Sequence, residues 1–179
     1  MFKRFLVACL TLLLGSSTAL ASEPYSVNEK AIVKVVCQEG IGTAFKIAQD
    51  KYVSAKHVVS KTECTIDGKP ISNVDITDKE DIATFTGPHT PNWVKVSCKG
   101  FEENKTYVAI GYGLGFPITM QNPWISTDYV QQGYNTFIGE GLPGMSGGPV
   151  INRKGEVTGI VTMRWPTRGY ALKFSKICE

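Results

Sequence analysis

Histidine is scarce in this chain, and motifs for metal or nucleic acid are missing. The 179 residues include only two histidines, His57 and His89. No C-x-x-C pair and no cluster of cysteine with histidine occurs, so the sequence gives no indication of a zinc site. No basic stripe is interleaved with aromatic residues, so nucleic-acid binding has no support. We therefore expect no bound metal and no nucleic-acid partner.

Long apolar runs are also absent, and the longest one lies at the N-terminus. Residues 1–21 begin with the basic pair Lys3 and Arg4, continue with the apolar run 5–14 and end in small residues. This is the pattern of a secretory signal, and the run is too short to span a membrane. Cys9 lies too near the start of the run to mark a lipoprotein cleavage site. The sequence predicts a secreted or periplasmic protein without membrane attachment after cleavage.

The remainder, residues 22–179, has an ordinary globular composition. The full chain is 42% hydrophobic and 20% charged, with a formal net charge of +3. Two of its positive charges lie in the signal, so the mature chain is close to neutral. This length suffices for one domain or for two small halves packed together.

Cysteine use is typical of an exported protein. Outside the signal, the cysteines are Cys37, Cys64, Cys98 and Cys178. An even number in an exported chain predicts two disulfides. The residues alone leave three pairings open.

Helical periodicity is missing until the last few residues, and short strand-like segments take its place. These segments are rich in Val, Ile, Thr and Tyr and are separated by Gly, Pro, Asn or Asp-Lys clusters. The pattern predicts an all-β sandwich or barrel. The polar stretch "KGFEENK" (Lys99–Lys105) divides the segments into two groups of similar size and is interpreted as a connection between two halves. The segments are "AIVKVVC", "GTAFKIA", "KYVSA", "NVDIT", "DIATFTG", "WVKVSC", "TYVAIGYG", "WISTDYV", "GGPVIN" and "EVTGIVTM".

A serine surrounded by glycines is the main chemical signal. Ser146 lies in "GLPGMSGGPVI" (141–151), which is either a tight turn or the support of a nucleophile. Gly-Met-Ser-Gly-Gly also fits the elbow of α/β-hydrolases, but no histidine follows Ser146 and helices do not alternate with strands. A base for Ser146 must therefore lie upstream. His57 follows an apolar strand and is better placed than His89, which lies in a proline-flanked loop.

A histidine base requires an acid that fixes its tautomer. Asp81 opens "DIATFTG", where the following strand would anchor it. Asp75 and Asp78 are alternatives in the preceding segment, and strand position gives Asp81 only a modest advantage.

In combination, five motifs resemble one family. "GTAF", "YVSAKHVV", "DIA", "GMSGGPV" and "GIVT" occur in the order and wording of the trypsin-like (chymotrypsin-fold) serine peptidases, over about residues 31–175. The short chain is most similar to the compact bacterial and viral members. The resemblance implies two packed antiparallel β-barrels, 30–98 and 106–179, within a peptidase domain at 22–179 and with a short C-terminal tail or helix. It further implies a monomeric serine endopeptidase that cleaves protein or peptide substrates and needs no cofactor.

The resemblance also implies roles for individual residues. His57 is expected to be the general base, Asp81 the residue that orients it, and Ser146 the nucleophile. The amides of Gly144 and Ser146 would form the oxyanion hole. Thr162 in "GIVT" is expected to support the aspartate.

Specificity and activation depart from the family pattern. Glu140 lies at the position that fixes charge preference in many relatives, which favours basic substrates, whereas Arg164 could neutralise it or select acidic residues. Met163 and Arg164 stand where relatives often have an aromatic residue and glycine. Met145 replaces the aspartate that pairs with a freed N-terminus, so propeptide activation is not expected.

The family's barrels also imply the disulfide pairing. The first strand of the first barrel lies beside the fourth, which would bring Cys37 to Cys64. The C-terminal tail returns to the connection between the barrels, which would join Cys98 to Cys178. The competing hypothesis for the whole chain is a catalytically silent member of the fold that acts as a binding protein.

Overall fold

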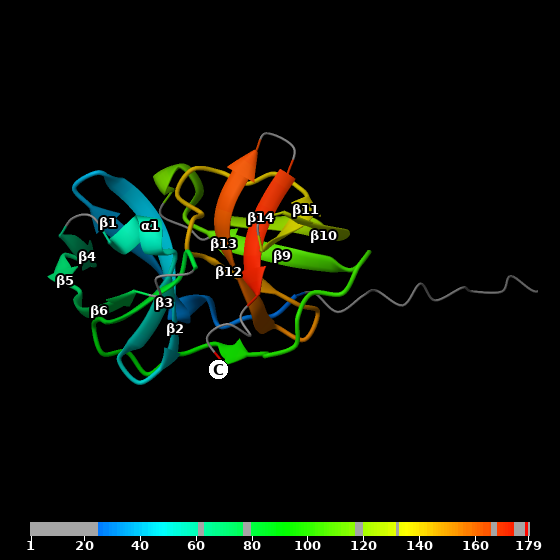
Figure 1. The fold of residues 1–179 in the computed structure, drawn as a ribbon. Coiled ribbons are helices and arrows are strands. Elements are labelled where there is room, and N and C mark those ends of the chain that lie inside the picture. The colour runs from blue at the N-terminus through cyan, green and yellow to red at the C-terminus, as the bar shows by residue number, and fades with distance from the viewer. Residues whose placement is uncertain are drawn as a thin grey trace, which may run out of the picture.

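Strands make up nearly all of the regular structure in the computed structural model, which describes residues 25–60, 63–76, 80–116, 120–131, 133–165, 168–173 and 178. The expected signal at 1–21 and the alternative acid Asp78 lie outside the described residues. The strands form two sheets that lie side by side (Figure 1). The mostly-β prediction is therefore confirmed.

The first sheet has seven strands in the order β5-β4-β1-β2-β3-β7-β6. Its neighbours in this order are antiparallel. A single turn of helix, α1 (Lys56–Val59), follows β3. The strands are β1 (Ile32–Cys37), β2 (Gly40–Ala48), β3 (Lys51–Ser54), β4 (Cys64–Ile66), β5 (Lys69–Pro70), β6 (Ser72–Ile76) and β7 (Ala83–Thr86).

The second sheet closes into a barrel. Its order is β12-β9-β10-β11-β14-β13-β8, and an additional pairing of β12 with β13 completes the ring. The short β8 is parallel to β13 and so belongs to this sheet, although it precedes the connection at 99–105. The elements are β8 (Lys95–Val96), β9 (Thr106–Gly111), η2 (Gly113–Gly115), β10 (Met120–Gln131), β11 (Tyr134–Ile138), β12 (Pro149–Ile151), β13 (Glu156–Trp165) and β14 (Arg168–Lys173).

Three clusters of buried side chains hold the molecule together. One fills the first sheet around Val35, Tyr52 and Phe85, and another fills the second barrel around Trp124 and Phe137. The third lies between the sheets and contains Phe45 and Ile82 from the first and Ile110 and Ile160 from the second, among others. Since each β-strand alternates its side chains between two faces, the strands at the boundary supply both cores.

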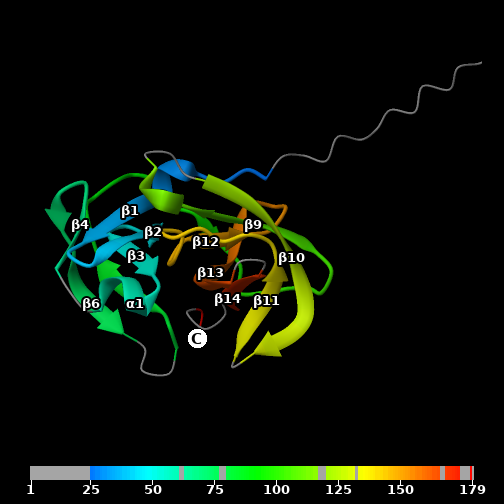
Figure 2. The ribbon, with the colours of Figure 1, turned by 90° about the horizontal axis from the view of Figure 1, so that it is seen from above.

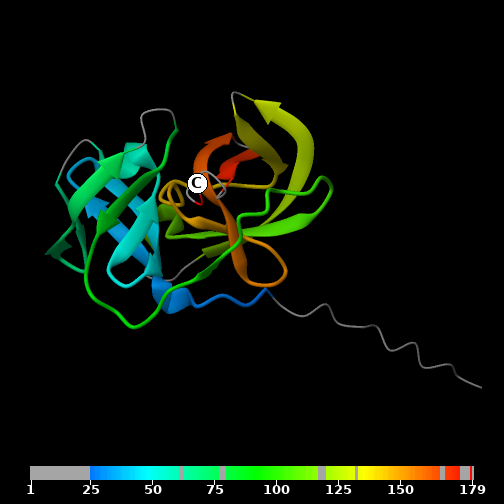
Figure 3. The ribbon, with the colours of Figure 1, turned by 60° about the horizontal axis from the view of Figure 1, so that its bottom comes forward.

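The N-terminal segment runs along the second barrel before the chain enters the first sheet (Figure 3, blue). The Tyr25 hydroxyl donates to the carbonyl of Thr106, and the turn at Gly155 packs on the backbone of Ser26. The segment continues through η1 (Glu29–Ala31) into β1. Seen from above, β10 and β11 form a long, curved hairpin at the outer side of the second barrel (Figure 2, yellow).

Two disulfides are present. Cys37 of β1 is bonded to Cys64, which lies directly opposite on β4. Cys98, two residues after β8, is bonded to Cys178 across 80 positions of sequence. This is the pairing that the resemblance implies. In the described part of the chain no helix is long and apolar enough to cross a membrane.

Candidate active site

Strand register brings His57 to Asp81. β3 and β7 are antiparallel, and Ser54 at the end of β3 lies opposite Ala83 at the start of β7. Because the strands are antiparallel, the residues that follow Ser54 and the residues that precede Ala83 leave the ladder at the same end and stay close together. His57, in the single turn of α1, and Asp81, just before β7, therefore meet beyond the edge of the ladder.

The Asp81 carboxylate holds His57 through both of its oxygens. Oδ1 accepts the His57 backbone N–H at 2.9 Å, and Oδ2 lies 2.7 Å from the ring Nδ1. The His57 side chain is 45% exposed and that of Asp81 is 16% exposed. An ionised carboxylate only accepts hydrogen bonds, so in the neutral ring Nδ1 carries the proton and Nε2 has its lone pair free. Nε2 can then accept a proton from a neighbour.

Of the alternative acids in the described residues, Asp75 lies elsewhere. It is exposed on β6 and pairs with Thr84 of β7. The described acid in contact with His57 is Asp81.

The phenol of Tyr134, on β11 of the second barrel, is influenced by the charge of Asp81. Burial raises the pKa of its phenol, and the negative charges of Asp81 and Glu80 raise it further. The ring is half-buried against the cluster between the sheets. Tyr134 is therefore a neutral neighbour of the Asp81 carboxylate at ordinary pH.

The backbone around Ser146 requires glycine. Gly144 and Gly147 have φ angles of +94° and +83°, which L side chains rarely adopt. A Cβ at Gly147 would overlap the hydroxyl of Ser54 and the carbonyl of Thr43, and one at Gly144 would overlap the carbonyl of Tyr112. Between them Met145 is fully buried in the core of the second barrel. Met145 is thus an apolar anchor for the loop.

Four successive carbonyls of this loop are held in place. The N–H of Leu114 donates to Pro143 at 2.6 Å, and the Thr43 hydroxyl donates to Gly144 at 2.7 Å. The N–H of Gly148 donates to Met145 at 2.9 Å, and the N–H of Thr43 donates to Ser146 at 2.8 Å. No oxygen of the described residues accepts the N–H of Gly144 or of Ser146. These two amides are available to a ligand oxygen.

His57 and Ser146 line one cavity although they come from different sheets. The cavity measures about 180 Å³, and Cys37, Val58 and the 39–41 turn complete its wall. A hydroxyl and an oriented imidazole therefore border one space, and the amides of Gly144 and Ser146 belong to the loop that carries this hydroxyl.

Two buried polar residues of the first sheet were not assigned a role from the sequence. Thr43 of β2 bonds Gly144 and Ser146, and the Ser54 hydroxyl donates to the Thr43 carbonyl at 2.7 Å. The motif "GTAF" contains Thr43, but it served only as one of the five motifs of the family resemblance and indicated no role for this residue. A threonine on a strand is ordinary in sequence, so no local signal distinguishes Thr43 from a packing residue.

The residues expected around the specificity pocket are described in part. Thr162 on β13 is 1% exposed, and its expected support of Asp81 stays a prediction. The side chain of Glu140 is exposed, and its carbonyl accepts the indole N–H of the fully buried Trp124 at 3.1 Å. Met163 and Arg164 continue β13, and their side chains lie outside the described residues. The role of Glu140 in specificity also stays a prediction.

The second histidine also has an acid. His89 Nδ1 lies 2.8 Å from Asp50 Oδ1, with both side chains exposed. Nothing in the residues around His89 predicts a partner for its ring. In the described residues no group of three His, Cys, Asp or Glu side chains could hold a metal ion.

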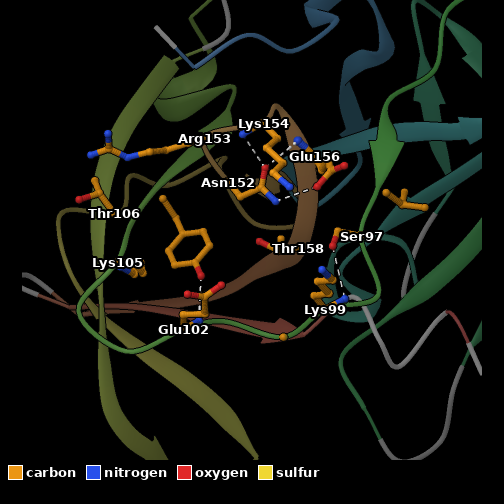
Figure 4. A pocket seen from close by; sticks show the side chains of 13 residues that line it. Ser97, Lys99, Glu102, Lys105, Thr106, Asn152, Arg153, Lys154, Glu156 and Thr158 are labelled. Carbon is orange, nitrogen blue, oxygen red and sulfur yellow. Dashed lines mark hydrogen bonds between the residues drawn. The ribbon is translucent and has the colours of Figure 1, made fainter. Parts of the chain in front are cut away.

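A larger cavity of about 350 Å³ lies on the second barrel (Figure 4). Neither His57 nor Ser146 lines it. Several of its polar groups bond one another: the Asn152 amide donates to Glu156 at 3.1 Å, and the Glu102 N–H donates to the Tyr107 hydroxyl at 2.8 Å. It is thus a separate polar hollow, distinct from the cavity that contains His57.

Comparison with known proteins assigns the fold. No protein-family model and no curated protein sequence matches this chain. Among solved structures, the active form of the Rv3671c protease from M. tuberculosis is 23% identical, with a TM-score of 0.74 over 84% of this chain and 78% of that one. A serine endoprotease from Yersinia pestis is 17% identical, with a TM-score of 0.73 over 84% of this chain and 61% of that one.

A viral structure is similar over nearly its whole length. The serine protease of human pathogenic astrovirus is 20% identical, with a TM-score of 0.69 over 84% of this chain and 93% of that one. The three similar structures are serine proteases of chymotrypsin-like architecture. The chain therefore has the chymotrypsin-like fold, as the resemblance implied.

Proposed function

We propose that this protein is an exported serine endopeptidase with His57, Asp81 and Ser146 as its catalytic triad. The observation that carries the proposal is the arrangement around the smaller cavity. There, Asp81 fixes the tautomer of His57, and Ser146 lines the same space. The fold, the expected signal at 1–21 and the two disulfides support the proposal.

The proposed acylation gives one task to each of these groups. His57 Nε2 takes the proton from Ser146 Oγ as Oγ bonds to the substrate carbonyl carbon. The negative charge that develops on the carbonyl oxygen is stabilised by the N–H groups of Gly144 and Ser146. Preorganised donors of this kind lower a barrier by about 3–4 kcal/mol each. As the C–N bond breaks, His57 returns its proton to the leaving amine.

Deacylation repeats these steps with water. Water gives a proton to His57 and attacks the acyl carbon, and the Ser146–acyl bond then breaks as Oγ recovers the proton. Asp81 stays ionised and stabilises the imidazolium in both stages. The substrate is a protein or peptide, the enzyme acts as a monomer, and no cofactor takes part. Thr162 is proposed to steady Asp81, and Glu140, with Arg164 nearby in sequence, is proposed to bias cleavage toward basic residues.

An active-site-directed phosphonate tests the proposal. The mature protein is incubated with a peptidyl phosphonate, and the adduct is located by mass spectrometry of its peptides. We expect one adduct, on Ser146, and none in His57→Ala, which keeps the serine but lacks the base. A wild-type protein that stays unlabelled while folded would favour the silent binding protein instead.

A further inference from the structure

Thr43 occupies the boundary between the two sheets and bonds to both. It belongs to β2 of the first sheet and is fully buried. Its side chain and backbone take part in four hydrogen bonds, with Tyr112, Gly144, Ser146 and Ser54. A buried polar residue with every group bonded holds its partners at fixed positions.

The direction of each bond to the Thr43 hydroxyl is determined by its partners. Oγ1 lies 3.0 Å from the Tyr112 backbone nitrogen, which can only donate. It lies 2.7 Å from the Gly144 carbonyl oxygen, which can only accept. The single hydroxyl proton must therefore point at Gly144. A side chain without a donor here leaves that carbonyl with no described partner.

The Gly144 carbonyl belongs to the peptide plane between the two proposed oxyanion donors. The Gly144 N–H shares its peptide plane with the Pro143 carbonyl, which accepts a hydrogen bond from the Leu114 N–H. The Ser146 N–H shares its plane with the Met145 carbonyl, which accepts from the Gly148 N–H. The intervening plane is held at its oxygen by Thr43. The other end of this plane is the Met145 N–H, which donates to the Leu142 carbonyl at 3.1 Å, so Thr43 supplies the bond at its oxygen end. Rotation there would change the relative aim of the two N–H groups.

The same residue links the serine to the histidine. The Thr43 N–H bonds the Ser146 carbonyl at 2.8 Å, and the Thr43 carbonyl accepts the Ser54 hydroxyl, three residues before His57. One buried residue thus connects the loop of the nucleophile to the strand of the base.

We infer that Thr43 is a positioning residue of the proposed peptidase, and that its hydroxyl keeps the Gly144 and Ser146 amides aimed at one point. The inference rests on the proposed function. Thr43 touches no substrate, so its effect is expected in the transition state and not in substrate binding.

Two near-isosteric variants separate the hydroxyl from the packing. Thr43→Val keeps the shape and removes the donor, whereas Thr43→Ser keeps the donor and removes the methyl group. With a peptide substrate we expect kcat of Thr43→Val to fall about 10- to 100-fold, below the loss caused by removing an oxyanion donor outright. KM should change less than about twofold, and Thr43→Ser should stay within about threefold of wild type in kcat.

Inhibition by a peptide aldehyde adds an independent readout. The aldehyde forms a hemiacetal whose oxygen occupies the oxyanion position, so its Ki for Thr43→Val should rise by the factor by which kcat falls. A purely structural role would leave the ratio of Ki to KM unchanged. The inference is overturned if Thr43→Val keeps kcat within twofold of wild type, or if Thr43→Ser loses as much as Thr43→Val. If Thr43→Val does not fold, Thr43→Ala replaces it in the same comparison with Thr43→Ser.

Phosphonate labelling distinguishes failure of this inference from failure of the proposed function. If wild-type protein is not labelled at Ser146, the proposed function fails, and the inference fails with it. If wild type is labelled and Thr43→Val is labelled at the same rate, the proposed function stands and the inference about Thr43 is wrong.

Discussion

Asp81 and His57 illustrate how far single residues can be interpreted. The carboxylate accepts from both the backbone and the ring of His57, whereas strand position alone gave Asp81 only a modest advantage over Asp75 and Asp78 and the resemblance was needed to select it. The distinction comes from the register of β3 and β7, which no local pattern encodes. The sequence motifs therefore identify which residue types are present, and the pairing of the strands decides which side chains come into contact.

Asp81→Asn is expected to lower kcat by about 10⁴-fold, as in a triad whose histidine adopts the wrong tautomer. The introduced amide can donate to Nδ1, which favours the His57 tautomer with the proton on Nε2. That tautomer has no lone pair on Nε2 to accept the proton of Ser146. Steady-state hydrolysis of a peptide substrate measures the loss. Asp75→Asn, an exposed change on the neighbouring β6, is the matched control and should keep activity within twofold. The assignment is wrong if the control is the more damaging variant.

The turn that presents Ser146 is an element in which conformation and space both demand glycine. Gly147 and Gly68 have similar φ angles, +83° and +73°, but a Cβ at Gly68 would have nothing within 4 Å. We expect Gly68→Ala to lower the free energy of unfolding by about 1 kcal/mol, the left-handed backbone cost alone. Gly147→Ala adds the overlap with Ser54 and Thr43 and should cost about 3 kcal/mol or more. Urea denaturation compares the two, and equal losses would contradict the crowding at Gly147.

The disulfides are expected to stabilise the fold unequally. Cys37–Cys64 spans 27 positions and Cys98–Cys178 spans 80. A longer loop restricts the unfolded chain more, so the expected contributions are about 3.5 and about 4.5 kcal/mol. Replacing each pair by alanine and measuring unfolding in urea tests the order. A larger loss from the Cys37–Cys64 pair would mean that native-state effects outweigh loop entropy.

Among elements, strands with β-branched sequences were predicted well and others were not. β1, β2, β9 and β13 fall within one or two residues of their expected segments. β11 ("YNTFI") was missed although Tyr, Thr, Phe and Ile favour strands, and β14 ("RGYALK") was missed because it carries no strong strand pattern. β14 lies between β11 and β13, so hydrogen bonds on both sides stabilise it regardless of propensity. The helical pattern expected near the C-terminus lies largely outside the described residues.

At the scale of the whole molecule, buried tyrosines predict a response to alkali. Burial raises the pKa of Tyr52 in the first sheet, Tyr107 in the second barrel and Tyr134 between them. Each phenol is harder to ionise in the folded state, so the stability it contributes is complete below pH 10 and is lost as pH rises through the folded-state pKa.

Urea midpoints at pH 8, 10 and 11 should therefore fall only above pH 10, with tyrosinate absorbance appearing as the protein unfolds. Tyr134→Phe removes one ionisable phenol and should reduce the fall. A midpoint that stays constant to pH 11 would contradict the raised pKa values.

The arrangement of the two sheets was predicted through the resemblance and not from the chain's own pattern, which allowed a sandwich or a barrel. Closure of the second barrel by the β12–β13 pairing and the crossing of β8 into that barrel depend on contacts far apart in sequence. The hydrogen bonds of Thr43 are of the same kind, since they join β2 to a loop about 100 positions away.

Ser146 and His57 are proposed to act as one unit, and a double-mutant cycle measures this coupling. Turnover of a peptide substrate is measured for Ser146→Ala, His57→Ala and the double variant, each shown to be folded by circular dichroism. We predict that each single change lowers kcat by about 10⁶-fold and that the double variant is little worse than either. A double variant whose loss in kcat equals the product of the two single losses would contradict a serine peptidase built on these two residues. A Ser146→Ala variant with a tenth of wild-type activity would contradict it as well.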